Sequence, residues 1–223
     1  MIPIKDDNYL ERVPYITFIL IGLNVIIFLY QLFAGKEGAM FTYKFALVPR
    51  NIFHSQGTPP FLTLISSMFL HGGPAHLIGN MLFLGIFGDD IEDALGHFRY
   101  LFFYIVCGVI AALTHALIHH ASGVPMLGAS GAISGILGAY LLLYPGAKIL
   151  TIVPIFFFLR FIWIKASFFL IVWFIFQLIY TASPQYQGIA FLAHIGGFLA
   201  GLGIIGLFKN YRGRKRKYEI LWP

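Results

Sequence analysis

Four polar side chains that could carry out acyl transfer lie inside stretches of otherwise apolar residues. They are His76 and Asn80, four residues apart, Ser130 within the sequence Gly-Ala-Ser-Gly, and His194. A serine hydroxyl can act as a nucleophile with a histidine as its general base, and amide or imidazole N–H groups can bind the resulting oxyanion. Polar groups are expensive inside a membrane, so those that occur there are candidates for a functional site. The pattern therefore indicates a serine hydrolase built within a bilayer.

Composition places these groups in a polytopic membrane protein. Of the 223 residues, 59% are hydrophobic and only 11% are charged, which is more apolar than a soluble domain requires. The net charge of +6 comes largely from the run Lys209 to Lys217, which follows the last apolar stretch. Basic residues beside a membrane helix are typical of topology signals and of contact with anionic lipid. We therefore expect the lipid bilayer, and not nucleic acid, as the partner of this run.

Six apolar stretches have about the length needed to cross a membrane as helices. They cover residues 14–34, 74–88, 98–120, 129–146, 163–182 and 188–208. The sequence thus predicts an all-α membrane protein in which both termini lie on the same side. Twelve of the 15 lysine and arginine residues fall on that side, and only Lys36, Lys44 and Arg50 fall on the other. Because basic residues are enriched in cytoplasmic segments, both termini are expected in the cytoplasm.

The same analysis divides the chain into three parts. Residues 1–13 are expected to form a cytoplasmic N-terminus, residues 14–208 a membrane domain, and residues 209–223 a basic cytoplasmic tail. The outer connection, residues 35–73, is long and rich in aromatic residues. We expect it to contain short helices that lie in the membrane interface.

The predicted topology brings the four polar side chains to a similar depth. The second, fourth and sixth helices all enter the membrane from the outer side, and His76, Asn80, Ser130 and His194 lie toward their outer ends. At a rise of about 1.5 Å per residue, all four fall in the outer half of the bilayer. Charge counting, which took no account of these residues, therefore places them where they could meet.

Each motif on its own has an ordinary structural explanation. The segment Gly128 to Gly131 could simply allow helices to pack closely, and a single histidine in a membrane is often only a hydrogen-bonding residue. Small residues at a spacing of four, Ala193, Gly197 and Gly201, predict that the sixth helix presses against another small-faced helix, for which the fourth is the candidate. Such packing would bring His194 within reach of the serine.

The acidic residues limit the mechanism. By the predicted topology, only Glu37 of the nine acidic residues lies on the outer side, in a loop. No carboxylate is thus placed to orient His194, which leaves a dyad of Ser130 and His194 and excludes a paired-aspartate intramembrane protease. A metal site formed by His71 and His76 is an alternative, but no acidic ligand accompanies them and the chain has no His-Glu-x-x-His motif. We expect neither a metal nor a cofactor.

Together these motifs resemble the rhomboid family of intramembrane serine proteases. The matching segments, which span roughly residues 60–205, are Ser67 to Gly73, His76 to Asn80, Gly88 to Glu92, Gly128 to Gly131, and Ala193-His194 with Gly197 and Gly201. The resemblance implies a six-helix bundle with a water-filled cavity open to the outer side. It implies Ser130 as the nucleophile and His194 as general base and then acid. Asn80, His76 and the backbone N–H of Ser130 would form the oxyanion hole. Substrates would be single-span membrane proteins, cut in or near the membrane at small residues.

Two departures from the family pattern are visible. Some members carry an aromatic residue four positions after the serine, where it stacks on the histidine, but this chain has Ser134 there. His194 must therefore be oriented by another group. Some members also have Trp-Arg in the first outer loop, where this chain reads Pro59-Pro60-Phe61-Leu62. That difference concerns the anchoring of the loop and leaves the chemistry unchanged.

Two functions other than proteolysis are alternatives for the same residues. Inactive rhomboid-like proteins bind client membrane helices, but they typically lack the serine or the histidine, and this chain has both. A transporter or channel is weaker still, because no charged residue inside the apolar stretches offers an ion path. The absence of an organelle signal favours a multi-pass protein of a prokaryotic plasma membrane. The sequence carries no signal for an oligomeric state.

Overall fold

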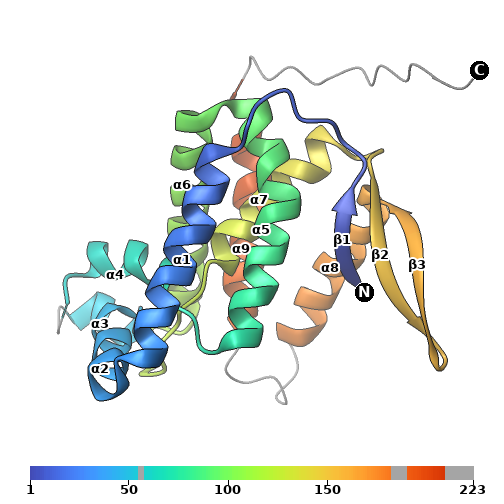
Figure 1. Ribbon diagram of the computed structural model, residues 1–223. Coiled ribbons are helices and arrows are strands. Elements are labelled where there is room, and N and C mark those ends of the chain that lie inside the picture. The colour runs from blue at the N-terminus through green and yellow to red at the C-terminus, as the bar shows by residue number, and fades with distance from the viewer. Residues whose placement is uncertain (55–57, 182–189, 209–223) are drawn as a thin grey trace, which may run out of the picture.

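The computed structural model describes residues 1–54, 58–181 and 190–208, and most of these are helical (Figure 1). The long helices are α1 (Tyr15–Phe33), α5 (Pro74–Leu95), α6 (His97–Ile118), α7 (Ser130–Leu143), α8 (Ala166–Thr181) and α9 (Phe191–Ile205). Each of them coincides largely with one of the six apolar stretches. The basic tail, residues 209–223, lies outside the described residues.

Within the described part, two helices, α1 and α6, are long and apolar enough to cross a membrane on their own. The pair Pro60–Phe69 and Pro74–Leu95 is apolar enough as a unit, and it is bent by 87° at a short break. The helices α7, α8 and α9 are apolar but shorter. These helices support a membrane protein, and a count of six spans stays a prediction.

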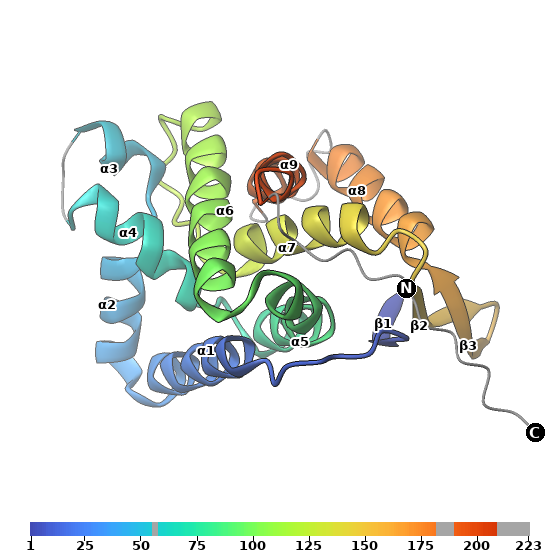
Figure 2. The same cartoon turned by 90° about the horizontal axis from the view of Figure 1, so that it is seen from above.

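The prediction of an all-α protein is wrong in one respect, because three strands form an antiparallel sheet beside α5 and α8 (Figure 2). β1 (Ile2–Asp6) pairs with β2 (Lys148–Ile155), and β2 pairs with β3 (Phe158–Lys165). The sequence predicts helix from residue 163, whereas β3 runs to Lys165 and α8 begins only at Ala166. Residues 149–164 are rich in β-branched and aromatic side chains, which favour strands, and an apolar run alone does not distinguish a strand from a helix.

The centre of the bundle is α7, which lies between α5, α6 and α9 when the molecule is seen from above (Figure 2). Its most extensive packing is on α9. Large aromatic side chains fill the space around it and are fully buried, among them Phe87, Tyr100, Tyr104, Tyr140 and Phe169. The helix that begins at Ser130 is therefore held on several sides by the rest of the bundle.

A buried carboxylate joins three helices at the opposite end of the bundle from the site. Glu92 is 0% exposed, and its two oxygens accept hydrogen bonds from the backbone N–H groups of Ile16 at 2.8 Å and Thr17 at 2.7 Å. It also contacts His97 Nδ1 at 2.6 Å. Because the first N–H groups of a helix have no partner within the helix, Glu92 acts as the cap of α1 while it belongs to α5.

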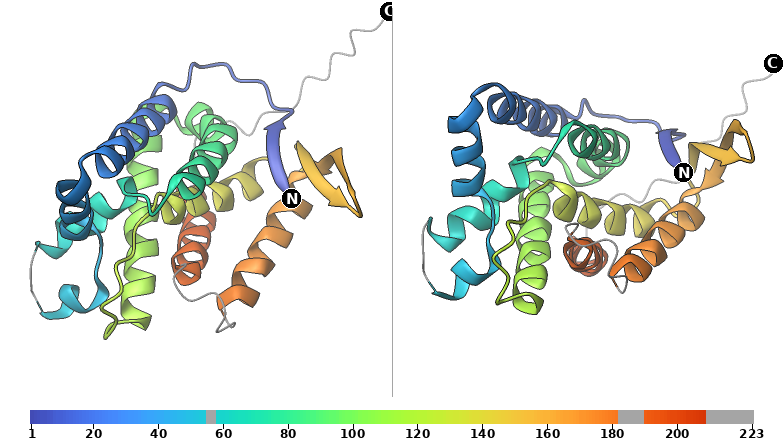
Figure 3. Two further views of the ribbon diagram at one scale, coloured as in Figure 1. Left: turned by 60° about the horizontal axis from the view of Figure 1, so that its bottom comes forward. Right: turned by 90° about the horizontal axis from the view of Figure 1, so that it is seen from below.

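Short helices connect α1 to α5 along one side of the molecule (Figure 3). They are α2 (Gly35–Phe45), α3 (Pro49–His54), α4 (Pro60–Ser66) and the 3-10 helix η1 (Ser67–Phe69). A backbone bridge between Leu47 and Met126 ties this region to the segment before α7. The backbone N–H of Gly128 donates to the carbonyl oxygen of Ser67 at 2.9 Å, so η1 supports the turn that leads into Ser130.

Candidate active site

Ser130 and His194 are in hydrogen-bonding contact, although 64 residues separate them in the sequence. Ser130 is the first residue of α7, and His194 lies in the first turn of α9. The distance from His194 Nε2 to Ser130 Oγ is 2.8 Å. At this distance the hydroxyl can donate its proton to an unprotonated Nε2, which is the geometry of a nucleophile beside its general base.

The contact depends on two glycine faces that let α7 and α9 approach closely. A β-carbon on Gly201 would lie 2.6 Å from the carbonyl carbon of Gly135, and one on Gly197 would lie 3.0 Å from the carbonyl carbon of Gly131. Both separations are shorter than an ordinary carbon–carbon contact. The prediction that the small residues of the sixth helix press against the fourth helix is therefore confirmed.

The other ring nitrogen of His194 also has a partner, which the sequence analysis missed. Nδ1 lies 2.9 Å from Oε1 of Gln177 on α8, and Nε2 of Gln177 donates to the carbonyl oxygen of Trp173 at 3.2 Å. Gln177 is only 6% exposed. The sequence does contain an indication of this role, because Gln177 is the only amide side chain in a helix that is otherwise almost entirely apolar.

Asn80 and His76 lie on α5, beside the turn that precedes Ser130. Gly128 in this turn has a φ of 127°, a conformation that side chains rarely adopt. A β-carbon there would lie 2.8 Å from the His76 ring and 3.6 Å from Asn80 Nδ2. Glycine thus gives both side chains access to the backbone two residues before the serine, and the N–H groups of the first turn of α7 are close by.

Asn80 is positioned by a chain of hydrogen bonds that begins on α1. The side-chain oxygen of Gln31 accepts from the backbone N–H of His71 at 3.0 Å, and His71 Nε2 lies 2.9 Å from Asn80 Nδ2. The amide carries a second N–H that can bind an oxyanion. His71, which the sequence offered as a possible metal ligand with His76, is thus placed to orient Asn80. Among the described residues, no group of three or more histidine, cysteine, aspartate or glutamate residues could hold a metal ion.

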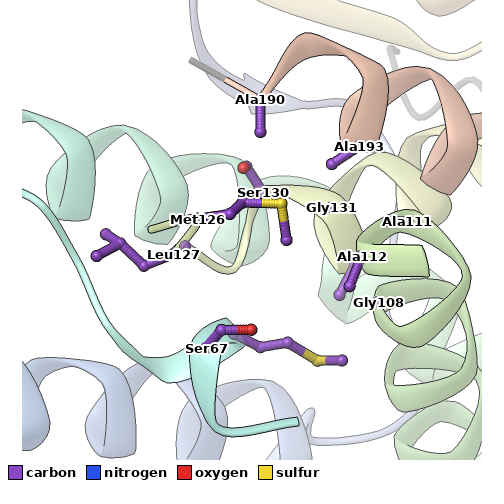
Figure 4. A pocket seen from close by; sticks show the side chains of 13 residues that line it. Ser67, Gly108, Ala111, Ala112, Met126, Leu127, Ser130, Gly131, Ala190 and Ala193 are labelled. Carbon is purple, nitrogen blue, oxygen red and sulfur yellow. The ribbon is translucent and has the colours of Figure 1, made fainter. Parts of the chain in front are cut away.

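Two cavities meet at Ser130. The larger has a volume of about 1120 Å³ and is lined by His76, Asn80, Ser130 and His194, together with residues from α6 and α8. The smaller has a volume of only about 20 Å³. Small side chains such as Ala111, Ala112 and Ala193 form much of its wall (Figure 4). All four side chains predicted as site residues therefore face one space, and a narrow recess adjoins the serine.

Comparisons with known proteins agree on one family. Residues 58–210 match the family model described as the Rhomboid domain. The chain is 33% identical over 143 residues to Rhomboid protein 1, mitochondrial, of Saccharomyces cerevisiae, which covers 62% of this chain and 39% of that protein. It is 32% identical over 129 residues to Rhomboid protease GluP of Bacillus subtilis, covering 57% of this chain and 24% of that protein. With Rhomboid protease GlpG of Haemophilus influenzae it shares 27% identity over 131 residues, covering 59% of this chain and 64% of that protein.

The chain spans less than half the length of the first two of these relatives. The family model, in contrast, covers well over half of this chain and includes all four polar residues of the site. This protein therefore belongs to the rhomboid family of membrane proteins.

Proposed function

We propose that this protein is an intramembrane serine endopeptidase that uses a dyad of Ser130 and His194. The observation that carries the proposal is the 2.8 Å contact between Ser130 Oγ and His194 Nε2 at the wall of a cavity inside an apolar bundle. Several relatives are named as proteases, which agrees with this chemistry. No carboxylate is required for the first step, because the neutral imidazole itself accepts the hydroxyl proton.

The reaction proceeds by acyl transfer. Ser130 gives its proton to His194 Nε2 while Oγ bonds to the carbonyl carbon of the scissile peptide, and the carbonyl oxygen becomes an oxyanion. Asn80, His76 and the backbone N–H of Ser130 donate hydrogen bonds to that oxygen. When the intermediate collapses, the C–N bond breaks and His194 gives its proton to the leaving amine. A water molecule then loses a proton to His194 and attacks the acyl carbon. The bond between that carbon and Oγ breaks, His194 returns its proton to Oγ, and the acid is released.

The proposed substrates are single-span membrane proteins. A transmembrane segment would enter from the side, between α5 and α8, and unwind locally over Ser130. The recess of about 20 Å³ beside the serine suits a small side chain at the cleaved position. This arrangement needs the topology expected from the sequence, with six spans between residues 14 and 208 and both termini in the cytoplasm.

A prokaryotic plasma membrane was the expected location, and the relatives do not support it specifically. Two relatives carry the word mitochondrial in their names, while others come from bacteria. The proposed location is therefore an integral membrane position, with no particular membrane assigned.

The test is labelling of the purified, folded protein in lipid by a serine-directed fluorophosphonate. Ser130→Ala and His194→Ala serve as the matched variants. Labelling of the wild type that is lost in both variants supports an activated Ser130. A folded wild type that resists labelling would overturn the proposal and favour a non-catalytic binder of client membrane helices.

A further inference from the structure

We propose that Gln177 is the positioning residue of His194, so that Ser130, His194 and Gln177 form a hydrogen-bonded series in which an amide takes the place usually held by a carboxylate. This inference rests on the proposed function, because it assigns a role to the residue behind the general base. It also answers how His194 is oriented in a chain that has Ser134 where other members stack an aromatic ring.

The hydrogen bonds of Gln177 fix which way its amide points. An amide oxygen can only accept and an amide nitrogen can only donate. Because Nε2 of Gln177 donates to the carbonyl oxygen of Trp173 at 3.2 Å, Oε1 is the atom that faces His194. The reversed amide would bring its oxygen against the Trp173 carbonyl, where two acceptors would meet without a proton between them.

The orientation of the amide then fixes the tautomer of the imidazole. Oε1 of Gln177 accepts at 2.9 Å, so the proton of the neutral His194 ring must be on Nδ1. The lone pair is therefore on Nε2, which faces the Ser130 hydroxyl at 2.8 Å. This is the tautomer that a general base beside a serine needs.

Gln177 acts through His194 and does not contact the substrate. Gln177 is not one of the described residues that line the two cavities at Ser130, and it is only 6% exposed. Its replacement should change the rate of the chemical step and leave substrate binding unaltered. A neutral amide also suits an apolar bundle, because a buried carboxylate would be far more costly to desolvate.

The experiment compares three variants that differ in the reach and chemistry of one side chain. Gln177→Leu removes the acceptor, and Gln177→Asn keeps the amide but is one methylene too short. Gln177→Glu has the same reach; in its protonated form, which apolar surroundings favour, it keeps an acceptor oxygen for His194 and has an O–H that can donate to the Trp173 carbonyl. Asn24→Leu is the control, because it removes a buried amide from α1 whose side chain bonds to the Leu20 carbonyl, away from the site.

The probe is a fluorophosphonate, measured over a range of concentrations. We expect Gln177→Leu and Gln177→Asn to lower the maximal labelling rate about tenfold, which corresponds to one hydrogen bond of ordinary strength. The half-saturating concentration should stay the same, Gln177→Glu should recover most of the rate, and Asn24→Leu should match the wild type. A folded Gln177→Leu that labels at the wild-type rate would overturn the inference.

A second measurement separates this inference from the proposed function. Nitrogen NMR of protein labelled at histidine, with His194→Ala to assign the signal, reports which ring nitrogen carries the proton. We expect Nδ1–H in the wild type and in Ser130→Ala, and loss of that preference in Gln177→Leu. The wild type could fail to react with the fluorophosphonate while NMR shows the proton on Nδ1. In that case the proposed enzymatic function is wrong, and the role of Gln177 in fixing the ring stands. A proton on Nε2 in the wild type would refute it.

A second and independent observation concerns the hairpin of β2 and β3. Its two-residue turn consists of Phe156 and Phe157, which are 95% and 98% exposed, and Phe156 adopts a φ of 52°. A bulky side chain with this φ is costly, since glycine or asparagine usually occupies such a turn. Most of the apolar side chains of β3 are also exposed, on both faces of the strand. An exposed apolar edge strand of this kind tends to pair or aggregate unless another surface shields it from water.

We infer that this hairpin lies against the bilayer. Two features of the surface around the hairpin indicate that lipid covers it. First, the hairpin leads into α8, whose exposed apolar side chains, such as Phe168 and Ile171, continue the same surface. Second, the exposed cations Lys148, Arg160 and Lys165 lie along the two strands, which suits anionic headgroups. Among the described strands, β3 has no neighbour on its outer edge, and this edge restricts the hairpin to the interface, because unsatisfied backbone groups are not tolerated in the hydrocarbon core.

A polarity-sensitive fluorophore tests this placement. The dye is attached at Phe157→Cys in a Cys107→Ala background, and the protein is placed in vesicles that contain phosphatidylglycerol. We expect a blue-shifted emission that lipid-borne quenchers reduce, whereas the same dye at Tyr9→Cys in the exposed N-terminal connection should emit as in water. Emission at position 157 equal to that at position 9 would overturn the inference. So would a shielded dye that lipid-borne quenchers do not reach in a dimeric protein, because a second copy would then be the cover.

Discussion

The contact of Gly201 on α9 with Gly135 on α7 gives the sharpest test of the proposed dyad. In Gly201→Ala the new β-carbon on α9 would lie 2.6 Å from the carbonyl carbon and 2.7 Å from the α-carbon of Gly135 on α7. Carbon atoms in contact prefer a separation of about 3.5 Å, so the helices must separate by about 1 Å. The obstacle is backbone, which cannot rotate aside. Such overpacking typically costs about 1–3 kcal/mol of stability.

The same displacement of α9 should lengthen the distance between His194 and Ser130. Gly201 is seven residues, or about two turns, from His194 on the same helix. If α9 moves as a rigid body by about 1 Å, the 2.8 Å contact between His194 and Ser130 lengthens beyond hydrogen-bonding distance. A displacement of this size can cost about a hundredfold in rate. We therefore expect the fluorophosphonate labelling rate of Gly201→Ala to fall by about that factor.

Gly203→Ala is the matched control for this prediction. It lies two residues further along the same helix, and a β-carbon there would meet nothing within 4 Å. We expect it to label at the wild-type rate and to be slightly more stable, because alanine favours a helix. Thermal unfolding of both variants in detergent establishes that they are folded. A folded Gly201→Ala that labels as fast as Gly203→Ala would refute the argument that glycine packing sets the distance within the dyad.

Three further changes have definite expected outcomes. Asn80→Ala should slow labelling by less than the roughly 10²–10³ typical for loss of an oxyanion donor, because His76 and the Ser130 N–H remain; a loss as complete as in Ser130→Ala would contradict this. Gly128→Ala should also slow labelling, because φ is 127° and its β-carbon would lie 2.8 Å from the His76 ring; an unchanged rate would show that the turn is not constrained. Glu92→Ala should lower stability by about 1–3 kcal/mol, measured by denaturation in detergent, since it leaves buried N–H groups unpaired; an unchanged melting temperature would contradict the capping role.

The sequence predicted the parts of the site that follow from the cost of polar groups in a membrane. Ser130, His194, Asn80 and His76 were selected because they interrupt apolar stretches, and the structure places all four around one cavity. The close approach of α7 and α9 was also predictable. Small residues at a spacing of four lie on one face of a helix, and such a face has few uses other than close packing.

The sheet was not predictable by the same reasoning. Hydrophobic periodicity identifies a strand when one face is polar, but β3 is apolar on both faces and reads as part of a membrane helix. The pairing of β2 with β1 also joins residues about 150 positions apart. Only the tertiary structure shows that the N-terminus, which the charge pattern marks as a simple extension, provides the third strand.

Gln177 was missed for a chemical reason. By the predicted topology, no carboxylate of the chain lies where it could orient His194, and a dyad is then the simplest prediction. Yet a neutral acceptor is sufficient to hold an imidazole in one tautomer, and an amide provides one without the desolvation cost of a charge. The criterion that had selected the other site residues, a polar side chain in an apolar helix, would also have selected Gln177.

Several polar side chains around the site form pairs across helices, and this limits how the proposed chemistry can be supported. Gln31 on α1 holds the His71 segment, His71 contacts Asn80 on α5, and Gln177 on α8 contacts His194 on α9. Gln31 and Gln177, at the outer ends of these two series of contacts, are neutral amides. An amide behind His194 fixes the ring but cannot offset the positive charge that develops on it as a carboxylate would. More of the stabilisation of the transition state must then come from the donors that face the oxyanion. Asn80 and His76 on α5, taken together, should therefore matter more in this protein than the oxyanion donors of an enzyme with an acidic third residue, although each of them partly substitutes for the other.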